Sequence, residues 1–133
     1  MERFDTSIWA PRLLGLLRIV TAFMFIQHGT LKLFGVPAIE GMGQVELMSI
    51  YGLAGVLEFV GGLLLLVGLF TRPVAFVLSG QMAFAYFMAH APQGFWPVLN
   101  KGELAALYSF VFLYLAVAGG GQWSLDRILR RTS

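Results

Sequence analysis

The segment LAGVLEFVGGLLLLVGLFTRP, residues 53–73, constrains this chain most, because its first nineteen residues contain a single charge. A run of this length and apolar character can cross the hydrocarbon core of a bilayer as a helix. The one charge is Glu58, and an ionised carboxylate at that depth costs about 3 kcal/mol or more unless a partner satisfies it. The segment therefore predicts a membrane-spanning helix and raises the question of what Glu58 contacts.

The composition of the whole chain agrees with a membrane location. Of its 133 residues, 58% are hydrophobic and 12% are charged, whereas roughly 25% of residues are charged in soluble domains. Because so few charges could not cover a soluble surface, we interpret the chain as an integral membrane protein. It contains no cysteine, which excludes disulfides, thiolate nucleophiles and iron–sulfur or zinc–thiolate sites. Nucleic-acid binding is not expected, because the arginines flank apolar segments.

Four segments have the character of transmembrane helices, and an open sheet would leave backbone groups unpaired in lipid. The predicted spans are residues 13–34, 49–70, 73–90 and 103–118. Turn-forming sequences bound these spans, namely Gly35-Val36-Pro37, Thr71-Arg72-Pro73, Ala91-Pro92-Gln93-Gly94 and Gly119-Gly120-Gly121. We therefore predict an all-α fold, an integral membrane four-helix bundle.

The basic residues predict how the bundle is oriented. Lys32 and Lys101 fall on one side of the predicted spans, and the arginines fall on or near the other side: Arg3, Arg12, Arg18, Arg72, Arg127, Arg130 and Arg131. The positive-inside rule then places both termini in the cytoplasm of a multi-pass plasma-membrane protein. The C-terminal WSLDRILRR predicts a short interfacial helix capped by Ser124, with Trp123 at the level of the headgroups.

The polar residues inside the spans gather on particular helix faces. At 100° per residue, Arg18, His28 and Lys32 of the first span lie within an arc of about 80°. In the second span, Gly55, Glu58 and Gly62 share one face, and the small residues allow another helix to approach closely. We therefore expect Glu58 to face the basic stripe of the first span.

Depth estimates favour His28 or Arg18 as the partner of Glu58 and place Lys32 at the limit of reach. One interpretation is a structural ion pair that fixes helix register. The other is a ligand site, because this apolar region holds more ionisable groups than one pair requires. The candidate interhelix or ligand-binding cluster comprises Arg18, His28, Lys32, Glu58 and His90.

The third span and the outer loop HAPQGFWPVLNKGE supply weaker candidates, Gln81, Trp96 and Glu103. Trp96 suits an interfacial aromatic belt, and Asn100 with Glu103 resembles a capping box for the fourth helix. No phosphate-binding, dinucleotide-binding, zinc-protease or nucleophile-elbow motif is present. Because the spacing of the two histidines does not support ligation, we expect neither a metal nor a haem.

Several stretches together resemble the DoxX family of small bacterial and archaeal membrane proteins. They are RLLGLLRIVTAFMFIQHGTLKLFG, LAGVLEFVGGLLLLVGLFTRPVA, MAHAPQGFWPVLNKGELAALY and GGGQWSLD. The resemblance covers nearly the whole chain and implies one four-helix domain over residues 1–133. Some members are subunits of a thiosulfate:quinone oxidoreductase, and others are linked to membrane complexes that handle oxidative stress. The resemblance thus implies quinone as a cofactor and puts Arg18, His28, Lys32 and Glu58 at the family's polar positions.

Two functions of different classes follow. The first is a subunit of a quinone-linked membrane oxidoreductase or oxidative-stress complex, with redox subunits or further copies of the chain as partners in the bilayer. Sulfur chemistry would then need a partner, because this chain has no thiol. The second is a non-enzymatic scaffold that stabilises partner proteins. A cavity beside the polar cluster would favour the first function, and a closed cluster would favour the second.

Overall fold

The structure is a computed structural model that describes residues 5–37 and 48–130, and within these ranges it contains helices and no strands. The elements are α1 (Thr6–Phe34), α2 (Ile50–Val67), α3 (Thr71–Ala85), η1 (Tyr86–His90), η2 (Ala91–Gln93), α4 (Pro97–Asn100), α5 (Glu103–Ala118) and α6 (Leu125–Arg130). The all-α class is thereby confirmed.

Three of the helical segments are long and apolar enough to cross a membrane, namely Thr6–Phe34, Ile50–Val67 and Thr71–Gln93. The fourth apolar helix, α5, has 16 residues and would be about 24 Å long, somewhat less than the hydrocarbon thickness of about 30 Å. The four-span bundle and its orientation in the membrane stay predictions.

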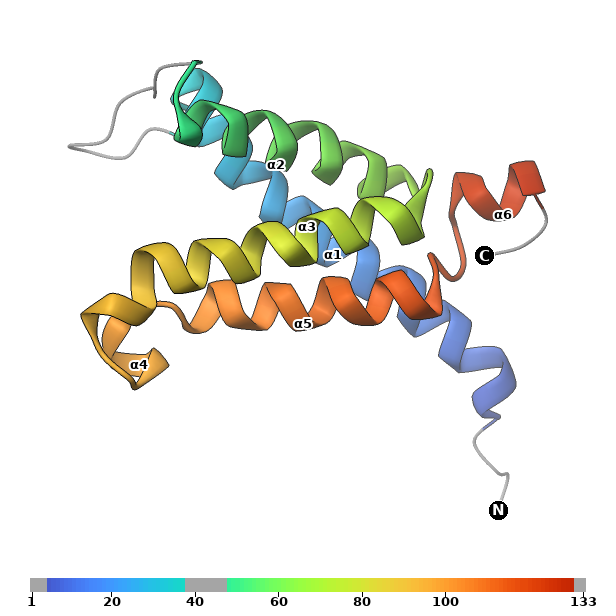
Figure 1. Cartoon of the computed structure of the whole chain (residues 1–133). Helices are drawn as coiled ribbons and strands as arrows, with labels where there is room; N and C mark the ends of the chain where they lie inside the picture. Colours follow the sequence, from blue (N-terminus) through green and yellow to red (C-terminus); the bar gives the residue numbers. More distant parts are fainter. Residues whose placement is uncertain (1–4, 38–47, 131–133) are drawn as a thin grey trace.

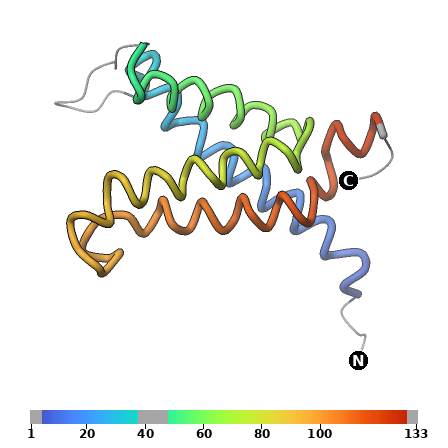
Figure 2. The backbone as a smooth tube through the Cα atoms, viewed as in Figure 1, coloured from blue at the N-terminus to red at the C-terminus, as the bar shows by residue number. Residues whose placement is uncertain are grey.

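The helices form two pairs, α1 with α2 and α3 with α5, and α2 also packs against α3. Figures 1 and 2 show α3 and α5 lying side by side while α1 crosses them obliquely. The buried core between the pairs is apolar and includes Ala22, Phe25, Leu65, Ala75, Leu78, Phe112 and Leu115. Many large apolar side chains instead lie exposed on the outer surface, as expected where lipid is the solvent.

Glycines allow α1 and α2 to approach closely. A Cβ atom on Gly29 would lie 2.6 Å from the backbone nitrogen of Phe59, and one on Gly62 would lie 2.5 Å from the side chain of Ile26. Gly55 faces Lys32, at 3.0 Å from its Cβ. The prediction that Gly55 and Gly62 face the first helix is therefore confirmed, and the crossing point lies beside Glu58.

The ends of the first two helices follow local signals. The Asp5 side chain accepts a hydrogen bond from Ser7 N, so α1 begins at Thr6 rather than at residue 13. Ser49 caps α2 in the same way. Gly35 and Gly68 end α1 and α2 in the left-handed conformation, which glycine adopts without steric cost.

The start of the third helix is set by a distant residue. The Asp126 carboxylate accepts hydrogen bonds from Phe70 N at 2.8 Å and from Thr71 N at 2.9 Å. Helix α3 therefore begins at Thr71, inside the turn predicted at residues 71–73. That prediction was wrong because the carboxylate that satisfies the free N–H groups lies 55 residues further along the chain.

The cap of α5 also differs from the predicted capping box. The N-cap residue is Gly102, and Glu103 is the first residue of the helix. Asn100 lies buried in the preceding turn, where its Oδ1 accepts a hydrogen bond from Gly102 N at 2.8 Å. Asn100 therefore organises the loop rather than the first turn of α5.

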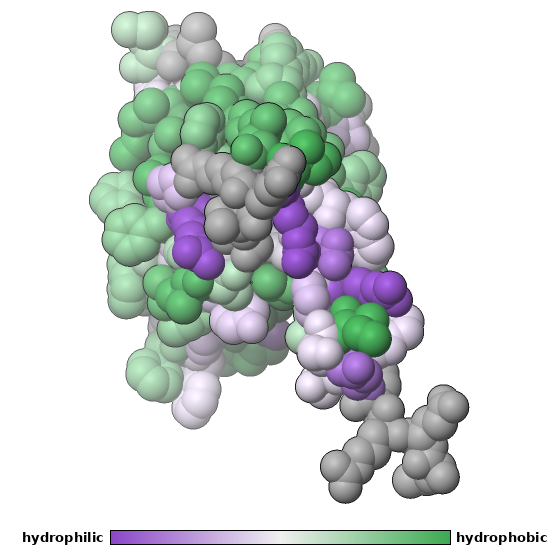
Figure 3. Space-filling model, turned by 90° about the vertical axis from the view of Figure 1, so that its right-hand side faces the viewer, coloured by the Kyte–Doolittle hydropathy of each residue, from purple (hydrophilic) through white to green (hydrophobic). Residues whose placement is uncertain are grey.

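One end of the molecule gathers the beginning of α1, the α2–α3 turn and α6 (Figure 1). Gln122 N donates to Pro11 O at 3.0 Å, and Asp126 N donates to Gly68 O at 2.9 Å. The predicted Ser124 cap is confirmed, because its Oγ accepts from Arg127 N at 3.2 Å. Figure 3 faces this end and shows polar residues across its middle, with apolar surface beside them.

Candidate functional site

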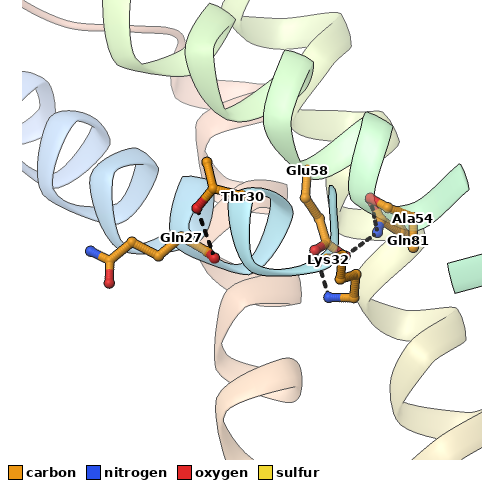
Figure 4. A network of polar contacts seen from close by, with 6 residues as sticks. All are labelled: Gln27, Thr30, Lys32, Ala54, Glu58 and Gln81. Atoms are coloured by element: carbon orange, nitrogen blue, oxygen red, sulfur yellow. Dashed lines mark hydrogen bonds and ion pairs between the residues drawn. The ribbon is translucent and has the colours of Figure 1, made fainter. Parts of the chain in front are cut away.

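Glu58 is buried at the place where α1, α2 and α3 meet. Its Oε1 lies 2.7 Å from Nζ of Lys32 on α1, and its Oε2 accepts a hydrogen bond from Nε2 of Gln81 on α3 at 2.8 Å. Figure 4 shows the three side chains pointing toward one another from their three helices, while the Gln27 amide points away. Both carboxylate oxygens of Glu58 therefore have a partner.

The prediction that Glu58 pairs with His28 or Arg18 was wrong. The depth estimate aligned the midpoints of the first two spans, whereas α1 is 29 residues long and meets α2 near its C-terminal end, at Gly29. Lys32 lies one turn beyond that crossing, and its flexible chain reaches back to the carboxylate. Arg18 lies eleven residues before the crossing, about 16 Å along the helix.

Arg18 belongs to a different polar network at the opposite end of the molecule. Its guanidinium is fully buried and donates to three backbone carbonyls of the segment between α5 and α6. Nη1 donates to Gly120 O and, at 3.3 Å, to Gln122 O, and Nη2 donates to Trp123 O at 2.9 Å. Arg18 thus holds the C-terminal segment against α1, and it is not part of the Glu58 cluster.

Gln81, a weaker candidate from the sequence, is a full member of the Glu58 cluster. Its Nε2 also lies 3.4 Å from the backbone oxygen of Ala54. An ionised carboxylate and a carbonyl can only accept, so the amide must present its nitrogen to both. The Lys32–Glu58–Gln81 triad, as we name these three residues, therefore joins three helices through fixed hydrogen-bond directions.

A cavity of about 390 Å³ opens beside the Lys32–Glu58–Gln81 triad. Its walls come from α1, α2, α3, η1 and α5, and most of its lining is apolar, including Phe25, Ala54, Met82, Ala85, Leu104 and Ala105. Four of the five residues of the predicted cluster line it, namely His28, Lys32, Glu58 and His90. The structure therefore brings these four side chains around one space and leaves Arg18 outside it.

His28 lies in the wall of the cavity, beside two aromatic side chains. Its ring centroid is 6.3 Å from that of Phe25 and 6.0 Å from that of Tyr108, with the Tyr108 ring nearly perpendicular. Within the described residues the imidazole makes no hydrogen bond, and the rings of Phe25 and Tyr108 are its aromatic neighbours. Both ring nitrogens keep their hydrogen-bonding capacity for a ligand.

His90 is held by the loop that precedes α5. Its Nδ1 lies 3.1 Å from the backbone oxygen of Asn100, and the Asn100 amide donates to Tyr86 Oη at 3.2 Å and to Gly94 O at 2.9 Å. The π-helical turn η1 contains both Tyr86 and His90. Such turns often accompany functional positions.

The remaining candidates lie outside the cavity, and several residues that line it were not singled out from the sequence. Trp96 and Glu103 are exposed and do not line it, whereas Tyr108 and Lys101 do. Tyr108 lies four residues before Phe112, and this helical spacing could have indicated that the two side chains share one face. In the structure their rings stack, with centroids 5.6 Å apart. No group of histidine and carboxylate side chains in the described ranges is arranged to hold a metal ion.

The arrangement suits a neutral, ring-shaped molecule that carries oxygen atoms. Apolar walls accept the ring, and a few polar groups fix its orientation, which is the usual construction of a small-molecule site. Within the described residues, Lys32 makes one hydrogen bond, to Glu58, so its ammonium has two further N–H groups to donate. The site could therefore hold a ring oxygen at the triad.

Comparisons with known proteins match this sequence to one family. The family model DoxX matches residues 13–91. A protein of Haemophilus influenzae, named only as uncharacterized, is 49% identical over 89% of this chain and 91% of its own length. An uncharacterized membrane protein of Mycobacterium tuberculosis is 31% identical over 86% of this chain and 80% of its own length. The inner membrane protein YqjF of Escherichia coli is 32% identical over 86% of this chain and 89% of its own length. No solved structure matches significantly.

Proposed function

The chain belongs to the DoxX family of membrane proteins, and from that premise we propose that it is the quinone-binding subunit of a membrane oxidoreductase or oxidative-stress complex. The observation that carries the proposal is the cavity of about 390 Å³ beside the triad. Its volume lies within the range of about 300–1,000 Å³ that is typical of small-molecule sites.

The residues of the cavity fit a quinone ring. The ammonium of Lys32 would donate to one ring oxygen, and its contact with Glu58, which also accepts from Gln81, would keep that ammonium in place. His28 and Tyr108 line the cavity from α1 and α5 and would pack their rings against the ligand. A quinone bound there would supply two-electron redox chemistry, and the chain has no cysteine that could act as a thiol reductant. The proposal therefore includes a partner subunit as the electron donor.

The alternative is a scaffold without a ligand, and the cavity argues against it. A polar cluster that serves only to fix helix register is fully satisfied and closed. The triad does not meet the first condition in full, because both oxygens of Glu58 are paired but the buried Oε1 of Gln81 has no hydrogen-bond partner among the described residues. The space beside it and the unbonded imidazole of His28 exceed what such a lock requires.

We expect His28→Ala to remove the bound quinone while leaving the fold intact, because His28 lines the cavity and makes no hydrogen bond within the described part of the chain. The measurement is the molar ratio of quinone to protein, by mass spectrometry, after purification in mild detergent. Gln27→Ala is the matched control, since its exposed side chain points away from the cluster (Figure 4).

The proposal is supported if the molar ratio of quinone to protein is near one for the wild type and for Gln27→Ala and near zero for His28→Ala. An unchanged ratio in His28→Ala contradicts the assigned site. Wild-type protein that carries no quinone, in the membrane or after addition of quinone, favours the scaffold.

We also propose that the chain crosses the plasma membrane four times with both termini in the cytoplasm. The exposed Arg12 and Arg72 lie on elements of the end that also carries α6, whereas Lys101 lies at the other end. Because the chain has no cysteine, a single introduced cysteine is the one thiol that a reagent can label. An impermeant thiol reagent should label Lys101→Cys in intact cells and should label Ser133→Cys only after lysis. The reverse pattern would contradict the orientation.

A further inference from the structure

The residues that line the cavity divide into a buried group and an exposed group. Phe25, Met82 and Tyr108 belong to the buried core. Other lining residues are large apolar side chains that also reach the outer surface, with between 44% and 56% of each exposed: Ile50 and Tyr51 of α2, Phe84 of α3, Met88 of η1 and Leu104 of α5. The cavity therefore has a closed inner end and an apolar rim at the surface.

Most of this rim flanks a space between α2 and α3. The two helices touch near their turn, where a Cβ atom on Gly61 would lie 3.0 Å from the side chain of Leu78. Further along, the hydrogen bond from Gln81 to Glu58 joins them, and Figure 1 shows them separating toward the start of α2 and η1. The Gln81–Glu58 bond is therefore the floor of an opening. The residues beyond this floor, which we name the mouth, are Ile50, Tyr51, Phe84 and Met88.

The packing and the chemistry of the rim both favour the mouth as the way into the cavity. Helix α3 packs much more extensively against α5 than against α2, so the side of the cavity between α2 and α3 is the more open one. The mouth is free of charge, whereas Lys101, the exposed charge among the described lining residues, lies in the loop before α5. Because lipid cannot satisfy polar groups, surfaces that face it are apolar. The mouth therefore has the surface chemistry of a lateral opening to lipid.

We propose that the cavity binds a ring that carries a long hydrocarbon tail, that the ring enters sideways from the lipid, and that the tail stays at the mouth between α2 and η1. This inference rests on the proposed function and adds the class of the ligand and its route. The cavity volume of about 390 Å³ is toward the lower end of the range of about 300–1,000 Å³ for small-molecule sites. Such a space accommodates the ring, so a long tail has to lie outside it.

The tail contributes little to the affinity for the protein. Hydrocarbon that moves from lipid to apolar side chains exchanges one apolar environment for another, because lipid tails are as apolar as leucine. The polar triad and the walls around the ring then set the affinity. A binding constant cannot locate the tail, whereas a photoreactive side chain at the mouth can.

The test places p-benzoylphenylalanine, which bonds to a nearby C–H carbon on irradiation, at single positions of the full-length protein in mild detergent. Decylubiquinone is the probe, and mass spectrometry measures the labelled fraction and locates the bond on the ring or on the decyl chain. Phe84→p-benzoylphenylalanine should be labelled several-fold more than Phe87→p-benzoylphenylalanine, with the bond on the chain. Phe87 is the matched control, since it is 70% exposed and lies three residues further along but is not among the described lining residues. Leu104→p-benzoylphenylalanine reports a tail that leaves past α5 instead.

Two further measurements connect the labelled tail to a ring inside the cavity. An excess of the same ring without a tail, dimethoxy-methyl-benzoquinone, should compete for the cavity and lower the labelling at Phe84 to the level at Phe87. The same decrease is expected when the Phe84 substitution is combined with His28→Ala, because His28 lines the cavity. Thermal unfolding checks that the combined variant is folded, and the competition experiment needs no second substitution.

The outcomes separate this inference from the proposed function. If decylubiquinone copurifies with the protein but labels Phe84 and Phe87 equally, or labels Leu104 more than Phe84, the route is overturned while quinone binding stands. Labelling at Phe84 that the tail-less ring does not lower comes from quinone in the surrounding micelle, and it also overturns the route. If no decylubiquinone binds, the proposed function fails and the inference fails with it.

Discussion

Arg18→Leu is expected to lower the free energy of unfolding by about 3–5 kcal/mol, because it removes a fully buried guanidinium from three backbone carbonyls. The carbonyls of Gly120, Gln122 and Trp123 would lose their donor inside the protein. Leucine fills part of the volume but supplies no hydrogen bond. The measurement is the free energy of unfolding in mixed detergent micelles.

Arg12→Leu is the matched control for this experiment. Arg12 lies on the same helix but is exposed, and its guanidinium packs over the Trp9 ring at 5.2 Å from the centroid. A contact of this kind contributes about 0.5–1 kcal/mol. Equal losses in Arg18→Leu and Arg12→Leu would contradict the assigned role of Arg18 in holding the C-terminal segment.

Glu58→Ala is expected to destabilise the protein by about 3–5 kcal/mol, because it leaves the ammonium of Lys32 and the amide of Gln81 without their shared acceptor. The carboxylate is almost entirely buried, with 4% of its side-chain surface exposed. Thermal and detergent-induced unfolding should both report the loss.

The double variant Lys32→Met with Glu58→Leu tests whether the loss comes from the unpaired charge. Removing both partners leaves no buried charge, so the double variant should be more stable than Glu58→Ala alone. If the double variant loses as much as the sum of the two single substitutions, the ion pair is not coupled. The double variant should also lose quinone binding, because it removes the Lys32 ammonium that donates to the ligand in the proposed function.

Features of the fold that depend on residues close together in the sequence could be predicted. The apolar runs identify the long helices, and Gly35 ends α1 as its position after the first run suggests. The close contact between the first two helices also follows from the spacing of Gly55 and Gly62. In these cases the signal lies within one helix or one turn.

The partner of Glu58 could not be predicted, because it depends on where two helices cross. Spacing places Lys32 and His28 on the same stripe of α1, and only the contact at Gly29 decides which of them meets the carboxylate. The start of α3 has the same origin, since its N–H groups are satisfied by Asp126 from the far end of the chain.

The candidate site was predictable as a group of residues but not in its hydrogen-bond directions. The sequence groups His28, Lys32, Glu58 and His90 in one half of the membrane, and the structure places them around one cavity. Arg18 was grouped with them because its partners are backbone carbonyls, which leave no trace in side-chain patterns. The contact between His90 and the backbone oxygen of Asn100 depends on the buried turn at Asn100, which no local spacing reveals.

The partners of Arg18 have a consequence for the order in which the protein is made. The guanidinium belongs to α1, whereas Gly120 is synthesised 102 residues later. At about 5–20 residues per second, that delay is roughly 5–20 s. During this interval a cation of the first helix has none of the carbonyls that later neutralise its cost in the apolar phase. Vectorial synthesis therefore leaves Arg18 of α1 without its acceptors until the segment between α5 and α6 has been made.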